Sequence, residues 1–149
     1  MSNAIIMHQT GGPEVLQWQP FDPGPPQAGE AIVRHDAVGL NFIDVYHRTG
    51  LYPIGDLPAI PGMEGAGRVE SVGSGVSEVA EGDRVAYAGL PPGAYAERRR
   101  IPAHRLVKLP DAIPAPQAAA MMLQGMTARY LLKGCTTVQA GHTILLHAA

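Results

Sequence analysis

The sequence predicts a mainly β protein with some α: a compact, partly open β-barrel over residues 1–113, then a long helix and an apolar strand within residues 114–149. Glycine (18 residues) and proline (14 residues) are spread between short β-branched segments, which is typical of short strands joined by turns. From residue 114 the chain changes character, because Ala, Met and Leu then recur with helical periodicity. These two patterns define the two regions.

The first half of the barrel region contains three expected strands. AIIMH at 4–8 is the first, the Gly-Pro turn in TGGPEVL leads to a second at 15–19, and a Pro-rich loop ends at the third, residues 30–40. In the next stretch Phe42, Val45 and Tyr46 have helical spacing and Gly50 is a typical stop, so residues 41–50 predict one or two helical turns.

The remaining strands of the barrel are expected at 65–76, in 81–89 after a Gly-Asp turn, and in one or two pieces within 93–110. A helix is expected over 114–134, with Pro116 near its start and Gly134 at its end. TILLHAA, starting at Thr143, is typical of a strand buried on both faces of a parallel sheet. Such a strand needs neighbours, so we expect the chain to be a piece of a longer protein.

Composition excludes several classes of function. The net charge of −2 gives no reason to expect nucleic acid or an anionic membrane as a partner. Arg98-Arg99-Arg100 is interpreted as a solvated strand face in preference to a phosphate site. Cys135 stands alone, which rules out a disulfide within the chain and a Cys-rich zinc site. Without a secretory signal or a membrane-length apolar run, a cytoplasmic protein is expected.

Several motifs resemble one family over essentially the whole chain. They are HQTGGPEVL, VGLNFIDVYHRTGLY, PGMEGAGRVESVGSGV, EGDRVAY, GAYAERR and QAAAMMLQGMTARYLL. Together they resemble the N-terminal part of the NADPH:quinone oxidoreductases, the zeta-crystallin-like branch of the medium-chain dehydrogenase/reductase superfamily. The resemblance implies a catalytic barrel similar to GroES, a linking helix at 114–134, and TILLHAA as the first strand of a truncated Rossmann domain. It also implies NADPH as cofactor and a homodimer for the full-length protein.

The residues expected at a catalytic zinc site of this superfamily are replaced here. The zinc branch has Cys three residues before an Asp, and this chain has Asn41 before Asp44. The zinc branch has Gly-His-Glu, and this chain has Gly62-Met63-Glu64. An amide and a thioether are poor substitutes for a thiolate and an imidazole, so no metal is expected.

A quinone does not require a Lewis acid, because its conjugated carbonyls accept electrons readily from a nicotinamide. The protein then has to orient the substrate and donate hydrogen bonds to the developing oxyanion. Asn41, Tyr46 and Tyr52 are neutral, polar and close in sequence, and they are the candidate catalytic residues. The alternative for each is ordinary loop or cap polarity.

The resemblance also implies the cofactor contacts. It places the segment Asn41, Phe42, Ile43 and Asp44 and the helix residue Thr127 beside the nicotinamide, and Tyr46 and Gln124 are added as neighbours. Glu64 is expected to be structural, bonded to a nearby backbone group. His47 is expected at the surface, and Met63, Met121 and Met122 are expected in the core.

Two other functions stay open. One is an enoyl or 2-alkenal reductase of the same superfamily, which uses the same scaffold on a conjugated C=C bond. The other is a non-catalytic role, as a lens crystallin or an RNA-binding protein, which the resemblance also allows. The net charge and the lack of an aromatic-basic patch argue against nucleic acid.

Overall fold

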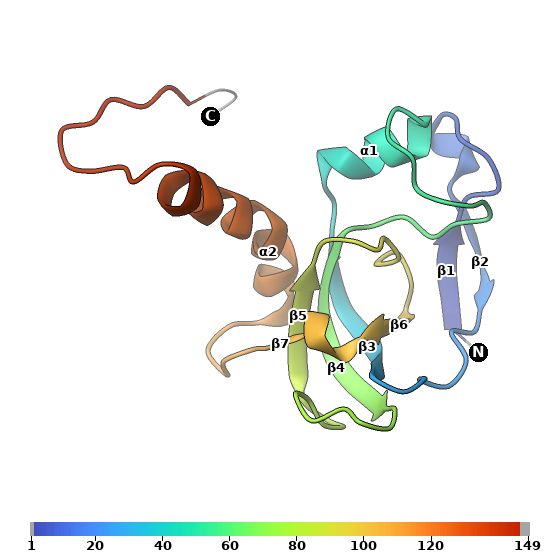
Figure 1. Cartoon of the computed structure of the whole chain (residues 1–149). Coiled ribbons are helices and arrows are strands. Elements are labelled where there is room, and N and C mark those ends of the chain that lie inside the picture. The colour runs from blue at the N-terminus through green and yellow to red at the C-terminus, as the bar shows by residue number, and fades with distance from the viewer. Residues whose placement is uncertain (1, 147–149) are drawn as a thin grey trace.

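The computed structural model describes residues 2–146, and its architecture is mainly β (Figure 1). Two antiparallel sheets are formed, a β1-β2 hairpin and a five-stranded sheet in the order β6-β3-β4-β5-β7. The larger sheet has free edges at β6 and β7, so the predicted partly open barrel is confirmed. The elements are β1 Ser2–Ile6, η1 Pro13–Val15, β2 Gln17–Phe21, β3 Glu30–Gly39, α1 Phe42–Thr49, β4 Glu64–Val72, β5 Arg84–Ala88, β6 Arg98–Pro102, η2 Ala103–Arg105, β7 Val107–Lys108, α2 Ala115–Arg129 and the π-helical η3 Tyr130–Cys135.

Strand β3 lies inside the sheet and leads directly to the site. Its buried residues Ala31 and Val33 pack with Val69 of β4, Val85 of β5 and Ile101 of β6 in the main hydrophobic core. The pairing of β3 with β4 shifts register between Ile32 and Val33 and again between His35 and Ala37. Such bulges bend a strand and increase its twist. The bent end of β3 therefore delivers residues 39–41 to the start of α1.

Helix α1 is defined by signals at both of its ends. The backbone N–H of Asn41, just before the helix, donates to Asp44 Oδ2 at 2.9 Å. This bond is half of a capping box, in which the third helical residue reaches back to the cap. Gly50 ends the helix with φ of 82°, a left-handed conformation that favours glycine. The predicted helical turns at 41–50 are thus confirmed.

Helix α2 projects from the barrel and packs against it through its first half (Figure 1). Ala118 and Ala119 are buried against Ala66 of β4 and Ala86 of β5. Gly39 of β3 lies so close that an added Cβ would stand 2.2 Å from the Ala119 carbonyl oxygen, which explains the glycine. Within residues 2–146, no helix combines the length and hydropathy needed to cross a membrane.

The strand expected from Thr143 is not formed in the part that the structure describes. Residues 143–146 carry no strand pairing, and residues 147–149 of TILLHAA lie outside the described residues. A parallel-sheet strand is stabilised by pairing on both sides, and no described strand lies beside this segment. Ile144 and Leu146 are accordingly exposed.

Three side chains lie elsewhere than the sequence predicts. Arg98 and Arg100 border solvent as expected, but alternation along β6 turns Arg99 inward, where it is 5% exposed. His47 is buried on the inner face of α1, and the prediction of a surface His was wrong. Met121 is 46% exposed, which contradicts its expected place in the core.

Candidate active site

An open cleft lies between the N-terminus of α1 and the outer face of α2. Its volume is about 580 Å³. Five of the predicted site residues line it: Asn41, Phe42 and Ile43 from the α1 side, and Gln124 and Thr127 from α2. Leu123, Ala128, Leu131 and Leu146 complete the lining. Residues more than 80 positions apart in sequence are thus brought together, and the cleft wall is mostly apolar with few polar groups.

Glu64 connects the two walls of this cleft. Its Oε1 accepts a hydrogen bond from Asn41 Nδ2 at 2.7 Å, and its Oε2 accepts one from the backbone N–H of Leu123 at 2.7 Å. Glu64 and Asn41 are both buried, with 1% and 6% exposure. Hydrogen bonds to a buried carboxylate are strong, so this pair of bonds fixes the start of α1 relative to α2. The prediction that Glu64 bonds to a nearby backbone group is confirmed.

Asp44 points away from the cleft and into the barrel. Its Oδ2 accepts the Asn41 backbone N–H and also the Tyr95 hydroxyl at 2.7 Å. Burial and the hydrogen bond to Asp44 raise the pKa of Tyr95, so this hydroxyl stays protonated and donates. Asp44 therefore does not line the cleft. Its side chain holds the Asn41 backbone in place by accepting the Asn41 N–H.

Tyr46 and Tyr52 do not line the cleft but pack next to a residue that does. Their rings pack edge to face with centroids 5.1 Å apart, and Tyr46 packs in the same way on Phe42 at 5.5 Å. Phe42, which does line the cleft, is 74% exposed, and Tyr52 is 49% exposed. The three rings form an aromatic cluster that extends from the mouth of the cleft. The structure therefore does not place either tyrosine with Asn41 in the cleft lining.

On the α2 side, Thr127 Oγ1 donates to the carbonyl oxygen of Leu123 at 2.8 Å. This bond to the preceding turn occupies the hydroxyl hydrogen and leaves the oxygen lone pairs facing outward as acceptors. Gln124 and Thr127 are exposed, on the same face of the helix. The α2 wall therefore offers a hydroxyl acceptor and a free amide.

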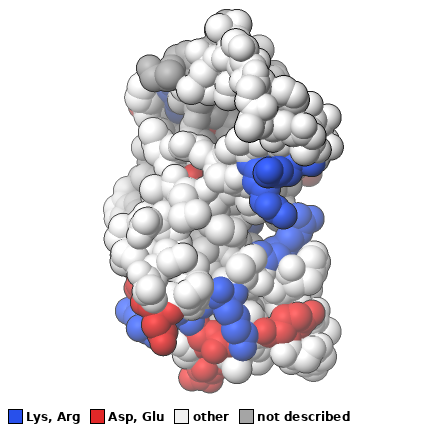
Figure 2. Space-filling view, turned by 90° about the vertical axis from the view of Figure 1, so that its left-hand side faces the viewer, with Lys and Arg blue, Asp and Glu red and all other residues white. Residues whose placement is uncertain are grey.

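The face of the molecule on the α2 side carries few charges over most of its area (Figure 2). Lys, Arg, Asp and Glu gather at its lower end and in one blue patch at the right, and only small blue and red spots appear elsewhere. Large apolar side chains are exposed along α2 and just after it: Met126, Tyr130, Leu131 and Leu132. An exposed apolar surface of this kind is typical of a surface that another domain or ligand covers.

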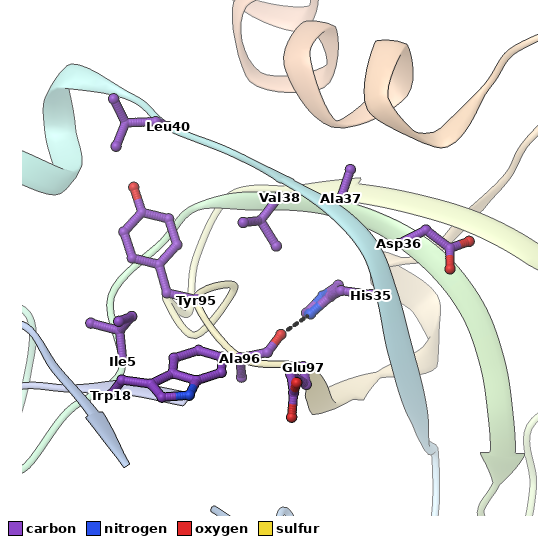
Figure 3. A pocket seen from close by; sticks show the side chains of 10 residues that line it. All are labelled: Ile5, Trp18, His35, Asp36, Ala37, Val38, Leu40, Tyr95, Ala96 and Glu97. Atoms are coloured by element: carbon purple, nitrogen blue, oxygen red, sulfur yellow. Dashed lines mark hydrogen bonds between the residues drawn. The ribbon is translucent and has the colours of Figure 1, made fainter. Parts of the chain in front are cut away.

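A second groove, of about 430 Å³, shares none of the predicted site residues (Figure 3). His35 lines this groove: its Nδ1 lies 2.6 Å from the Ala96 carbonyl oxygen and its Nε2 lies 2.7 Å from the Tyr87 hydroxyl. Because a carbonyl only accepts, Nδ1 carries the proton, and Nε2 of the neutral ring accepts from Tyr87. Burial lowers the pKa of His35 from 6.5 to about 4.

The His35 shift predicts how stability depends on pH. The unfolded chain binds a proton near pH 6.5 and the folded chain only near pH 4, so stability is highest above pH 6.5 and falls as the pH drops toward 4. The loss from this group is up to roughly 3 kcal/mol. Urea unfolding at pH 7, 5.5 and 4 measures it. His35→Gln should flatten the profile over this range, and an unchanged slope in that variant would contradict the assignment.

The sequence does not predict that Glu64 and Tyr95 both hydrogen-bond to the segment at the start of α1. Glu64 and Tyr95 both bond to the Asn41–Asp44 segment, from 23 and 51 residues away. The available signal was Glu64 itself, a carboxylate within the apolar, glycine-rich stretch PGMEGAG. A buried carboxylate requires hydrogen-bond donors, and Asn41 is a suitable one.

The chain is similar to several known proteins. Residues 27–111 match the family model described as the alcohol dehydrogenase GroES-like domain. The chain is 50% identical over 149 residues to a quinone oxidoreductase of Pseudomonas aeruginosa, covering 100% of this chain and 46% of that protein. It is 40% identical over 154 residues to a 2-haloacrylate reductase of a Burkholderia species, again covering 100% of this chain and 46% of the relative.

A solved structure of a quinone oxidoreductase is also similar to this chain. The Escherichia coli quinone oxidoreductase, solved in complex with NADPH, is similar with a TM-score of 0.89 and 46% identity, over 92% of this chain and 42% of that one. The chain thus spans about half the length of the curated relatives it matches.

Proposed function

The chain belongs to the family of alcohol dehydrogenase GroES-like domains, and from this premise we propose that it is the N-terminal catalytic part of an NADPH-dependent quinone reductase that works without zinc. The observation that carries the proposal is the cleft between α1 and α2. It gathers Asn41, Phe42, Ile43 and Thr127, which the resemblance implies beside the nicotinamide, together with Gln124, which was expected as their neighbour. The NADPH named for the E. coli neighbour supports the cofactor.

The cleft suits a flat ring and an electron-rich oxygen. NADPH, when bound, supplies the electrons. Asn41 and Thr127 would contact the nicotinamide ring of the cofactor. Phe42 offers an exposed aromatic face to a quinone ring. The amide of Asn41 has two hydrogens, and Glu64 accepts only one. The second hydrogen can donate to the oxygen on which negative charge develops. Glu64 keeps the amide oriented for this role.

The residues at the former zinc position do not fit a zinc ion. Asn41 directs an amide hydrogen at Glu64, and an amide is a poor zinc ligand beside the thiolate and imidazole that zinc prefers. Met63 is buried, with 4% exposure. Among residues 2–146, no group of three His, Cys, Asp or Glu comes together in an arrangement that could hold a metal ion.

This chain by itself should bind NADPH weakly. The cleft would contact only the nicotinamide end of the cofactor, and the 149 residues contain no G-x-G-x-x-G phosphate-binding turn. Fluorescence titration of the 149-residue chain should give a dissociation constant well above the low-micromolar range. A low-micromolar constant would mean that this chain holds most of the nucleotide contacts.

A second candidate is a reductase of conjugated C=C bonds, which the 40% identity to a 2-haloacrylate reductase supports. Such an enzyme would use the same cleft, with Asn41 donating to the carbonyl oxygen of the enone or enoate. Turnover of 1,4-benzoquinone and of a 2-alkenal by the full-length gene product separates the two. A higher kcat/KM for the quinone supports the first candidate, and a higher kcat/KM for the alkenal supports the second.

A further inference from the structure

Strand β6 carries three consecutive arginines, and their partners differ. Arg98 Nε lies 2.5 Å from Glu70 Oε2, and Arg100 Nε lies 3.3 Å from Glu30 Oε2. Arg99 points to the opposite face and has no carboxylate within 4.0 Å in the described part of the chain. Arg99 is 5% exposed, so a positive charge is buried there without a counter-charge.

The surroundings of Arg99 satisfy it only in part. Nη2 donates to the carbonyl oxygens of Pro91 at 2.5 Å and Pro92 at 3.3 Å, and Cζ lies 4.7 Å from the centre of the Tyr87 ring. Nη1 is buried and has no hydrogen-bond partner. Removing a charged group from water is unfavourable unless the group is paired and hydrogen-bonded. Arg99 thus retains an unused donor and an unbalanced charge.

A pocket of about 390 Å³ opens beside this guanidinium. Two loops, residues 54–60 and 91–93, form its walls together with Phe21 and Pro23. Arg99 and Arg100 both line this pocket. Strand β6 is at the edge of its sheet, and a pocket at a sheet edge can contact side chains from both faces of the strand. Asp56 is the single carboxylate among the lining residues, and it is exposed.

We propose that this pocket binds a small oxyanion, a phosphate or carboxylate group, through Arg99 and Arg100. Guanidinium groups match the geometry of both oxyanions, and a bound anion would supply the counter-charge that Arg99 lacks. Asp56 favours an anion that also carries a hydrogen-bond donor, as hydrogen phosphate does. None of these residues lines the α1–α2 cleft, so the anion site is separate from the proposed cofactor site.

Calorimetric titration of the 149-residue chain with inorganic phosphate tests the site, at pH 7 and at an ionic strength held constant with sodium chloride. A saturable isotherm with one site per chain is expected. Arg100→Gln should weaken phosphate binding about tenfold, the usual effect of losing one charge-assisted hydrogen bond. Arg98→Gln is the matched control, because Arg98 lies next to the pair but does not line the pocket, and binding should change less than twofold.

Arg99→Lys keeps the charge and removes the planar fork, so it should weaken binding at least as much as Arg100→Gln. If that variant does not fold, Arg100→Gln against Arg98→Gln still decides the matter. A parallel titration with malonate identifies the class of anion: binding of either probe supports the site, and their relative affinities separate phosphate from carboxylate. Absence of saturable binding for both probes would overturn the proposal, as would equal weakening by Arg98→Gln and Arg100→Gln.

Discussion

Replacing Glu64 with alanine should lower the free energy of unfolding of the chain by about 3 kcal/mol or more. The substitution removes the acceptor of the Asn41 amide and of the Leu123 N–H, and both donors lie at the junction of α1 and α2. It also leaves a cavity where a side chain with 1% exposure had been. Urea denaturation of the 149-residue chain, followed by circular dichroism, measures the loss.

Two variants make this test specific. Glu64→Gln should cost clearly less, because the Asn41 amide can rotate by 180° and accept from the new NH₂ group while the Gln oxygen still accepts from Leu123. Glu81→Ala removes an exposed glutamate and should change stability by less than about 0.5 kcal/mol. If Glu64→Ala is no worse than Glu81→Ala, the bridge between the two helices does not hold the site together.

Replacing Asn41 with alanine in the full-length gene product should lower kcat for quinone reduction on the order of 100-fold. Asn41 is the polar side chain of the cleft whose orientation Glu64 fixes, and loss of a donor to a developing oxyanion acts mainly on kcat. Steady-state kinetics with NADPH and 1,4-benzoquinone measure the effect. KM for the quinone should change much less than kcat.

Controls separate this catalytic role from folding. Asn41→Ser keeps a side chain suited to a helix N-cap but is too short to hold the same position, so it should fold and still lose activity. Tyr52→Phe removes a hydroxyl from the aromatic cluster outside the cleft and should have a several-fold effect at most. Near-normal kcat in a folded Asn41→Ala variant would remove Asn41 from the catalytic residues.

Local sequence signals predicted much of the fold. The spacing of apolar residues and Gly50 predict the helix at Phe42–Thr49, and β-branched residues between turns predict the strands. The predicted strands at 4–8 and 15–19 lie at Ser2–Ile6 and Gln17–Phe21, a shift of two residues. End positions depend on pairing with distant strands, which local patterns do not contain.

Only part of the site could be predicted, because local sequence patterns do not contain contacts between distant residues. The resemblance implied Asn41, Phe42, Ile43 and Thr127, helix spacing added Gln124, and the fold brings these five residues together in the α1–α2 cleft. The direction of the Asp44 side chain depends on a partner that is distant in sequence. The directions of Tyr46 and Tyr52 depend on the turn that follows α1. Asp44 turns inward because Tyr95 donates to it, and Tyr52 turns back onto Tyr46. Arg99 is buried because alternation along β6 outweighs its charge.

The most direct test of the proposed function is NADPH consumption by the full-length gene product with 1,4-benzoquinone, with and without a metal chelator. We expect turnover that is the same in both conditions, because the proposed site uses Asn41, Glu64 and the α2 wall and no metal ion. Turnover that disappears with the chelator and returns with added zinc, or no quinone turnover at all, would contradict it.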